Sequence, residues 1–291
     1  MTNFEPLHPL FGVIVGDVDL TGPLADDVFA EIRAAFEKYS LLVFHDQPVS
    51  DEQQLAFSRR FGPLELTKIG ALGAGTELVI LTNVDPDAGP DGAIAPPEHR
   101  LHGSHRANSL WHTDSSFKKT PALASLLSGR VVPSVGAETE FASMRAAYAA
   151  LPDETKQHIE GKVVMHSFAN SRNQIDKDLA SSAERDELPP VPHPMVKANP
   201  ATGEKSFYLA SHAAHIVGMP VEDGKSLIAE LIDATTAADR VYRHAWREHD
   251  LVMWDNRCML HRGQPFDDQK YRRHMIRTTV SDVDAGAEAA A

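Results

Sequence analysis

Beyond residue 120 the sequence consists largely of short apolar segments separated by turn-forming residues, and this spacing restricts the fold more than any other feature. The segments fall at residues 122–132, 139–144, 162–168, 195–200, 205–210, 250–256, 259–263 and 274–282. Many short strands with few helices between them favour a sandwich or jelly roll over a doubly wound sheet. We therefore expect a mainly β protein with flanking helices.

Strand and helix patterns alternate before residue 120. Residues 11–20 alternate between apolar and small or polar residues and predict a strand, and the apolar segments 41–47 and 77–84 predict two more. Residues 24–40 predict a helix, and residues 50–62 predict another, with Ser50 as its cap and Gln53 in the capping-box position. Residues 144–159 and 222–237 also have helical spacing.

Two long stretches, residues 85–107 and 168–193, lack periodicity and predict loops. Long loops in compact proteins often act as lids. We expect each of them to be a lid on a single domain that spans residues 1–291.

Composition excludes several classes of protein. The net charge of −13 argues against a broad surface for nucleic acid or for an anionic membrane, and no run of 18 apolar residues is present. Cys258 is the single cysteine, so one chain cannot form a disulfide or a thiolate cluster. The start of the sequence lacks the pattern of a cleaved signal, and we expect a cytoplasmic protein.

A short pattern in residues 110–117, LWHTDSSF, predicts a metal site. On a strand, His112 and Asp114 point to the same face, and two imidazoles with one carboxylate are the ligands of non-haem iron(II). His261, at the end of an apolar segment, is the candidate third ligand. The alternative is a polar strand end with a hydrogen-bonded histidine. No H-E-x-x-H motif supports a zinc hydrolase.

Three arginines lie close together in the segment YRRHMIRTTV. On a strand, Arg273 and Arg277 share one face and Arg272 lies on the other. Two arginines on one face can each bind a carboxylate, which predicts sites for two anions. A charged, solvated edge strand is the alternative interpretation.

These motifs, taken in order, resemble one family. The segments WHTDSSF, GAETEFASMRAAYAALP, WDNRCMLHRG and YRRHMIRTTV are similar to those of the TauD/TfdA (taurine dioxygenase-type) family of iron(II)- and 2-oxoglutarate-dependent dioxygenases, over roughly residues 6–283. The chain looks most like the branch that acts on 2,4-dichlorophenoxyacetate. The resemblance implies a double-stranded β-helix (jelly roll, cupin-like) core, with Fe(II), 2-oxoglutarate and O₂ as cofactor and co-substrates.

The resemblance also implies roles for individual residues. His112, Asp114 and His261 match the iron ligands, and Thr139 and Arg273 match the residues that bind 2-oxoglutarate, with Arg272 as a rival for the second role. The positions that match substrate contacts are Arg277, Asn108, Lys68, His212 and His215. His212 and His215 are equally well explained as hydrogen-bonded core or turn histidines.

The implied reaction is hydroxylation of the carbon next to the ether oxygen of an aryloxyalkanoate, which yields a phenol and glyoxylate, with succinate and CO₂ from the co-substrate. The alternative is the same chemistry on a taurine-like sulfonate, an alkyl sulfate or another small carboxylate. A lysine at position 68, where the taurine enzyme has a histidine, favours the aryloxyalkanoate. A non-catalytic jelly-roll binding protein is a further alternative, and related enzymes lead us to expect a homo-oligomer.

Overall fold

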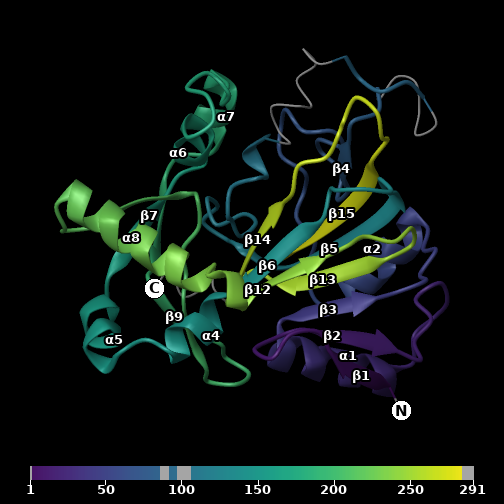
Figure 1. Ribbon diagram of the computed structural model, residues 1–291, viewed down its shortest axis with the longest axis horizontal. Helices are drawn as coiled ribbons and strands as arrows, with labels where there is room; N and C mark the ends of the chain where they lie inside the picture. The colour runs from purple at the N-terminus through teal and green to yellow at the C-terminus, as the bar shows by residue number, and fades with distance from the viewer. Residues whose placement is uncertain (1, 86–91, 97–105, 284–291) are drawn as a thin grey trace.

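A seven-stranded sheet forms the centre of the computed structural model, which describes residues 2–85, 92–96 and 106–283 (Figure 1). Its strands, in spatial order, are β1 (Asn3–Pro6), β2 (Val13–Gly16), β3 (Leu41–Phe44), β13 (Leu251–Asp255), β5 (Ala122–Val131), β15 (His274–Ser281) and β4 (Val79–Thr82). Neighbouring strands are antiparallel except for β2 and β3. Strands from both ends of the sequence therefore lie side by side.

Two helices cover one face of this sheet. They are α1 (Asp26–Tyr39) and α2 (Asp51–Arg59), and α2 begins with the predicted capping box of Ser50 and Gln53. Alternate residues of the central strands, including Leu42, Phe44 and Met253, are buried against these helices. This apolar layer holds α1 and α2 against one face of the sheet.

The opposite face of the sheet packs against a three-stranded sheet with the order β12 (Val241–His244), β6 (Thr139–Ser143) and β14 (Met259–Gly263). The intervening alternate residues, including Val43, Leu127 and Trp254, are buried here with Phe141 of β6 and Met259 of β14. This second layer places His261 of β14 against the central sheet.

The rest of the chain forms a second group of elements, on the left of Figure 1. A three-stranded sheet has the order β11 (Ala213–Ile216), β7 (Val163–His166) and β8 (Val191–Pro194), and β9 (Val196–Ala198) pairs with β10 (Lys205–Phe207). The helices are α4 (Met144–Ala149), α5 (Asp153–Ile159), α6 (Phe168–Asn173), α7 (Ser182–Glu187) and α8 (Val221–Thr235), and a 3₁₀ turn covers Ala238–Arg240.

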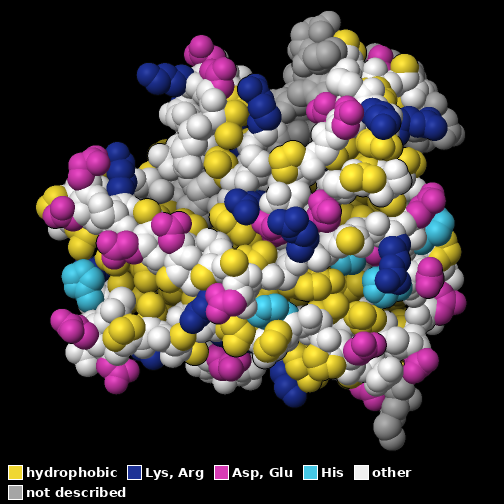
Figure 2. Space-filling view, viewed as in Figure 1, with side chains coloured by type: hydrophobic (Ala, Val, Ile, Leu, Met, Phe, Trp, Pro, Cys, Tyr) yellow, Lys and Arg dark blue, Asp and Glu magenta, His cyan; other side chains and the backbone are white. Residues whose placement is uncertain are grey.

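The expectation of a mainly β protein with flanking helices is confirmed. The predicted helix over residues 144–159 is instead two helices, because Pro152 ends the first at a turn and begins the second. Among the residues that the structure covers, no helix combines the length and apolar character that a membrane span requires. Figure 2 shows acidic and basic side chains interspersed over the visible face, so the negative charge is not gathered in one patch there.

The interpretation of residues 168–193 as a structureless loop was wrong. This stretch contains α6 and α7, each capped by a serine hydroxyl, Ser167 and Ser181, and the first residues of β8. Both helices are only six residues long, too short for apolar periodicity to reveal them. The other predicted lid, residues 85–107, lies largely outside the described residues.

Candidate active site

The predicted metal ligands His112 and His261 are joined through their backbones. The amide of His112 donates to the carbonyl of His261 at 3.0 Å, and the amide of His261 donates back at 2.8 Å. The pair forms an isolated antiparallel bridge, so His112 lies in an extended segment rather than in the regular strand that we expected. Their rings face each other, with centroids 4.1 Å apart.

Asp114 completes this group of side chains. One ligand atom from each of His112, Asp114 and His261 lies within 4.8 Å of the others, and all three residues are buried. Oδ2 of Asp114 accepts a hydrogen bond from Ser125 Oγ at 2.7 Å, and Oδ1 accepts one from Arg277 at 2.5 Å. The carboxylate therefore has a fixed orientation.

Asn256, which the sequence analysis did not identify, organises the backbone at this site. Its side-chain oxygen accepts hydrogen bonds from the Asp114 amide at 3.1 Å and from the Trp254 indole at 3.0 Å. Its amide nitrogen donates to Ser125 Oγ at 2.9 Å, the same hydroxyl that contacts Asp114. The only signal in the sequence was a polar pair, Asp255 and Asn256, directly after an apolar strand.

Burial and charge give this cluster the protonation states of a metal site. Burial lowers the pKa of His112 and takes that of His261 well below its usual value, so both imidazoles are neutral near pH 7. Burial raises the pKa of Asp114, but Arg277 and the two histidines outweigh it, and the pKa lies well below its usual value. Two neutral imidazoles and one ionised carboxylate suit a divalent cation.

The surroundings of the two ring Nδ1 atoms are compatible with neutral imidazoles that bind a metal. Nδ1 of His112 donates to the Leu110 carbonyl at 2.7 Å, which leaves Nε2 as a lone-pair donor for a metal. Nδ1 of His261 is buried without a hydrogen-bond partner in the structure's described part. The cluster therefore fits a metal ion, and the remaining ligands would come from small molecules.

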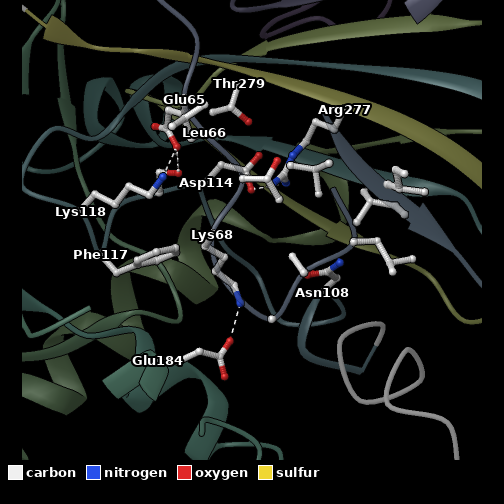
Figure 3. A pocket seen from close by; sticks show the side chains of 18 of the residues that line it. Glu65, Leu66, Lys68, Asn108, Asp114, Phe117, Lys118, Glu184, Arg277 and Thr279 are labelled. Carbon is white, nitrogen blue, oxygen red and sulfur yellow. Dashed lines mark hydrogen bonds and ion pairs between the residues drawn. The ribbon is translucent and has the colours of Figure 1, made fainter. Parts of the chain in front are cut away.

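A cavity opens beside the cluster (Figure 3). His112 and Asp114 line it, together with an apolar wall of Leu66, Leu72, Val79, Ile80 and Leu81. The ring of Phe117 forms another part of the wall, and Ser181 and Glu184 near the start of α7 also line the cavity. The mixture of apolar and charged lining suits a ligand with both an apolar body and an anionic group.

Three carboxylate–cation pairs lie in the lining. In Figure 3, Lys68 points towards Glu184, with Nζ 2.5 Å from Oε1, and Arg277 points towards Asp114. Lys118 Nζ lies 2.6 Å from Glu65 Oε2, which also accepts a hydrogen bond from Ser115. A fourth cation, Arg172 of α6, also lines the cavity and was missed from the sequence.

Four of the five residues predicted to contact substrate line the cavity, and one does not. Arg277, Lys68, Asn108 and His212 all line the cavity, as their proposed role requires. His212 is buried, its Nδ1 is 3.0 Å from Ser116 Oγ, and burial keeps its pKa well below the usual value. His215 is exposed on β11 and is not part of this lining, so the structure does not bring it to the site.

Thr139 and Arg273, predicted to bind 2-oxoglutarate, lie outside the lining of this cavity. Thr139 is buried at the start of β6, and its Oγ1 accepts a hydrogen bond from the Trp246 indole at 3.0 Å. The backbone of half-buried Arg273 is held by Asn83, whose Oδ1 accepts from the Arg273 amide at 2.7 Å. Burial lowers the pKa of Arg273 to about 10.

A sheet-rich fold with buried His112, Asp114 and His261 at the edge of a cavity defines a protein with a two-histidine, one-carboxylate site. The chain belongs to the family described as taurine catabolism dioxygenase TauD, TfdA family, whose model matches residues 3–279.

Similar sequences and structures of known proteins are consistent with this family. The chain is 41% identical to the alpha-ketoglutarate-dependent 2,4-dichlorophenoxyacetate dioxygenase of Cupriavidus pinatubonensis, over 96% of this chain and 98% of that protein. It is 37% identical to an (S)-phenoxypropionate/alpha-ketoglutarate-dioxygenase of Sphingobium herbicidovorans, over 91% and 90% of the two chains. The crystal structure of AAD-2 in complex with Mn(II) and N-oxalylglycine superimposes with a TM-score of 0.87, at 40% identity over 97% of each chain.

Proposed function

We propose that this protein is an Fe(II)- and 2-oxoglutarate-dependent dioxygenase that hydroxylates the carbon next to the ether oxygen of an aryloxyalkanoate. The observation that carries the proposal is the buried cluster of His112, Asp114 and His261 beside a cavity with an apolar wall and charged groups. The relatives named above, which act on aryloxyalkanoates, support the choice of substrate class.

In the proposed site, His112, Asp114 and His261 hold the iron. Bound Fe(II) supplies the activation of O₂ that couples oxidation of 2-oxoglutarate to succinate and CO₂ with hydroxylation of the substrate. Ser125 and Asn256 keep Asp114 in place, and the Leu110 carbonyl fixes the ring of His112. These contacts restrict the positions of the ligands before any small molecule binds.

Arg273 and Thr139 are the proposed anchors for the distal carboxylate of 2-oxoglutarate. Burial lowers the pKa of the half-buried Arg273, and an anionic ligand would stabilise its charged guanidinium. Arg272 is exposed at the surface, which makes it the weaker candidate. The Trp246 indole donates to Thr139 Oγ1, so the hydroxyl proton of Thr139 is directed to another acceptor.

The substrate is proposed to lie in the cavity with its anionic end on the side of Arg277. Its aryl group would contact the apolar wall and Phe117, which exclude water from the reacting carbon. Hydroxylation next to an ether oxygen gives a hemiacetal, which breaks down to a phenol and glyoxylate. Sulfonates and alkyl sulfates have less support, because the relatives at 37% and 41% identity are named for aryloxyalkanoates.

We further propose a double-stranded β-helix core, with the seven-stranded sheet and β12-β6-β14 as its two facing layers. The packing of these sheets across one apolar layer supports this topology. A cytoplasmic location, a homo-oligomeric state and lids at residues 85–107 and 168–193 also remain proposals. The family resemblance motivates them.

The test is a coupled assay with purified protein, Fe(II), 2-oxoglutarate and O₂. We expect phenol and succinate to form from phenoxyacetate or 2,4-dichlorophenoxyacetate in equal amounts, and little succinate to form with taurine. His112→Ala should abolish both products. Succinate without phenol from every aryloxy acid would keep the dioxygenase class and contradict the proposed substrate.

A further inference from the structure

The cavity is lined by four cationic side chains, and three of them already contact a carboxylate. Lys68 pairs with Glu184, Lys118 pairs with Glu65, and Arg277 pairs with Asp114. Arg172 has no ion pair with any residue in the part of the chain that the structure describes. Its charge is therefore available to a ligand without the loss of an ion pair.

The helix that carries Arg172 is well anchored. Ser167 caps the start of α6, and the hydroxyl of Ser171 is 2.9 Å from that of Ser211, in the segment just before His212. Phe168 is buried and lies one helical turn before Arg172, whose guanidinium carbon is 4.5 Å from the centre of the ring. This contact holds the guanidinium beside an aromatic cluster that includes Phe117.

The acidic group whose charge acts on Arg172, Glu184, does not neutralise it. Glu184 influences Arg172 through its charge, but its Oε1 is already in contact with Lys68 Nζ. Burial lowers the pKa of Arg172 to about 10, because its charge is only partly compensated. Lys68, Arg172 and Glu184 together carry an excess of one positive charge, which an anion can balance.

Arg172 and Arg277 line the cavity from different elements, α6 and β15. Arg277 donates to Asp114, whereas Arg172 lies over the ring of Phe168, which packs on Phe117 and through it on His212. A ligand in the cavity can therefore meet Arg172 on the histidine side, next to the rings of Phe117 and Phe168. An aromatic ring and a carboxylate are the two chemical groups that fit such surroundings.

We propose that Arg172 recognises the carboxylate of the substrate and is a specificity residue of this enzyme, in addition to Arg277. This inference rests on the proposed function, because it takes an aryloxyalkanoate as the ligand. Arg277 is in direct contact with Asp114, whereas Glu184 compensates the charge of Arg172 only in part. The Lys68–Glu184 pair keeps Glu184 from competing with that substrate.

Binding without turnover tests the proposal. Protein loaded with Mn(II) and N-oxalylglycine would be titrated calorimetrically with phenoxyacetate and with its uncharged analogue phenoxyacetamide. We expect the wild type to prefer the acid, and Arg172→Gln to lower the affinity for the acid by about 10- to 100-fold while that for the amide hardly changes. Arg172→Lys should recover part of the preference, because it restores the charge without the planar fork.

Arg185→Gln is the matched control. Arg185 lies on α7, donates to the Asn173 side chain at 3.2 Å and is not part of the cavity lining. The Arg185→Gln variant should keep the preference of the wild type for the acid over the amide. An acid-to-amide affinity ratio that Arg172→Gln leaves unchanged would overturn the proposal, and circular dichroism would establish that the variant is folded.

The outcomes separate this inference from the proposed function. Coupled phenol and succinate formation with an unchanged affinity ratio in Arg172→Gln would refute only the role of Arg172. A lost preference for the acid in Arg172→Gln, with no phenol formed by the wild type, would support Arg172 as an anion site and refute the proposed reaction.

Discussion

His112 and His261 exchange two backbone hydrogen bonds, with N···O distances of 3.0 and 2.8 Å, although they come from distant parts of the sequence. This reciprocal pair sets the separation of the two imidazoles before any metal binds. The Asp114 side chain joins them from the same segment as His112, and its position depends on polar contacts that can be removed one at a time.

Removing the hydroxyl that orients Asp114 should weaken metal binding without unfolding the protein. In Ser125→Ala, Oδ2 of Asp114 loses the hydrogen bond that Ser125 donates at 2.7 Å. Hydrogen bonds to metal-binding side chains contribute about 10- to 100-fold to metal affinity, and we expect a loss of that size for Fe(II) or Mn(II). Calorimetric titration with Mn(II) under anaerobic conditions would measure it.

Ser128→Ala is the matched control on the same strand. Ser128 is buried on β5, but its hydroxyl donates to Gln54 of α2 and not to the metal cluster. The Ser128→Ala variant should bind Mn(II) as tightly as the wild type does. Equal losses in the two variants would show that general loosening of β5, and not the contact with Asp114, controls the affinity.

Asn256→Ala should be strongly destabilising. Asn256 is completely buried, and its side chain contacts the Asp114 amide, the Trp254 indole and Ser125 Oγ. The substitution leaves buried donors without acceptors, and we expect the free energy of unfolding to fall by about 2–4 kcal/mol. Urea unfolding of the metal-free protein would measure it, and a loss below about 0.5 kcal/mol would mean that water replaces the amide.

The Lys68–Glu184 pair should hold α7 against the segment that follows α2. Gly70 has a φ of +75°, and a Cβ there would lie 3.3 Å from Glu184 Oε1, so this turn approaches α7 closely. We expect Lys68→Gln and Glu184→Gln each to speed amide exchange in α7, and the double variant to add little more. Hydrogen–deuterium exchange would measure these rates.

This comparison also tests the role predicted for Lys68 from the sequence. A direct contact between Lys68 and the substrate carboxylate predicts a lower affinity for phenoxyacetate in Lys68→Gln with unchanged exchange in α7. A structural role predicts faster exchange in α7 in both single variants.

Stability should fall at mildly acidic pH, partly because of His193. Burial and the charge of Lys197 lower the pKa of His193 to about 4, whereas an unfolded histidine has a pKa of about 6.5. Between these values the unfolded chain binds a proton that the folded chain does not. Stability is therefore complete above about pH 6.5 and is lost as the pH falls towards 4.

The expected size of this effect is about 1 kcal/mol between pH 7.5 and pH 5.5, since one pKa unit corresponds to about 1.4 kcal/mol. Urea unfolding at both pH values would give the loss for the wild type and for His193→Gln, which retains a donor for the Lys118 carbonyl. The variant should lose about 1 kcal/mol less than the wild type. Equal losses would assign the pH dependence to other buried histidines.

The features that the sequence predicted correctly are those encoded by near neighbours. Ser50 and Gln53 identify the start of α2 because a capping box needs only three residues of spacing. His112 and Asp114 come together because they are two residues apart in one short segment that turns at Asp114. The short apolar segments mark strands for the same reason, since their pattern depends on local geometry alone.

The tertiary structure decided which distant groups meet. The sequence analysis singled out Lys68 and Arg277 and missed Arg172, and only the folded chain pairs Lys68 with Glu184 and Arg277 with Asp114. It also joins Asn256 to the Asp114 amide and leaves His215 at the surface. Such pairings depend on which faces of separate elements pack together, and local periodicity holds no information on that packing.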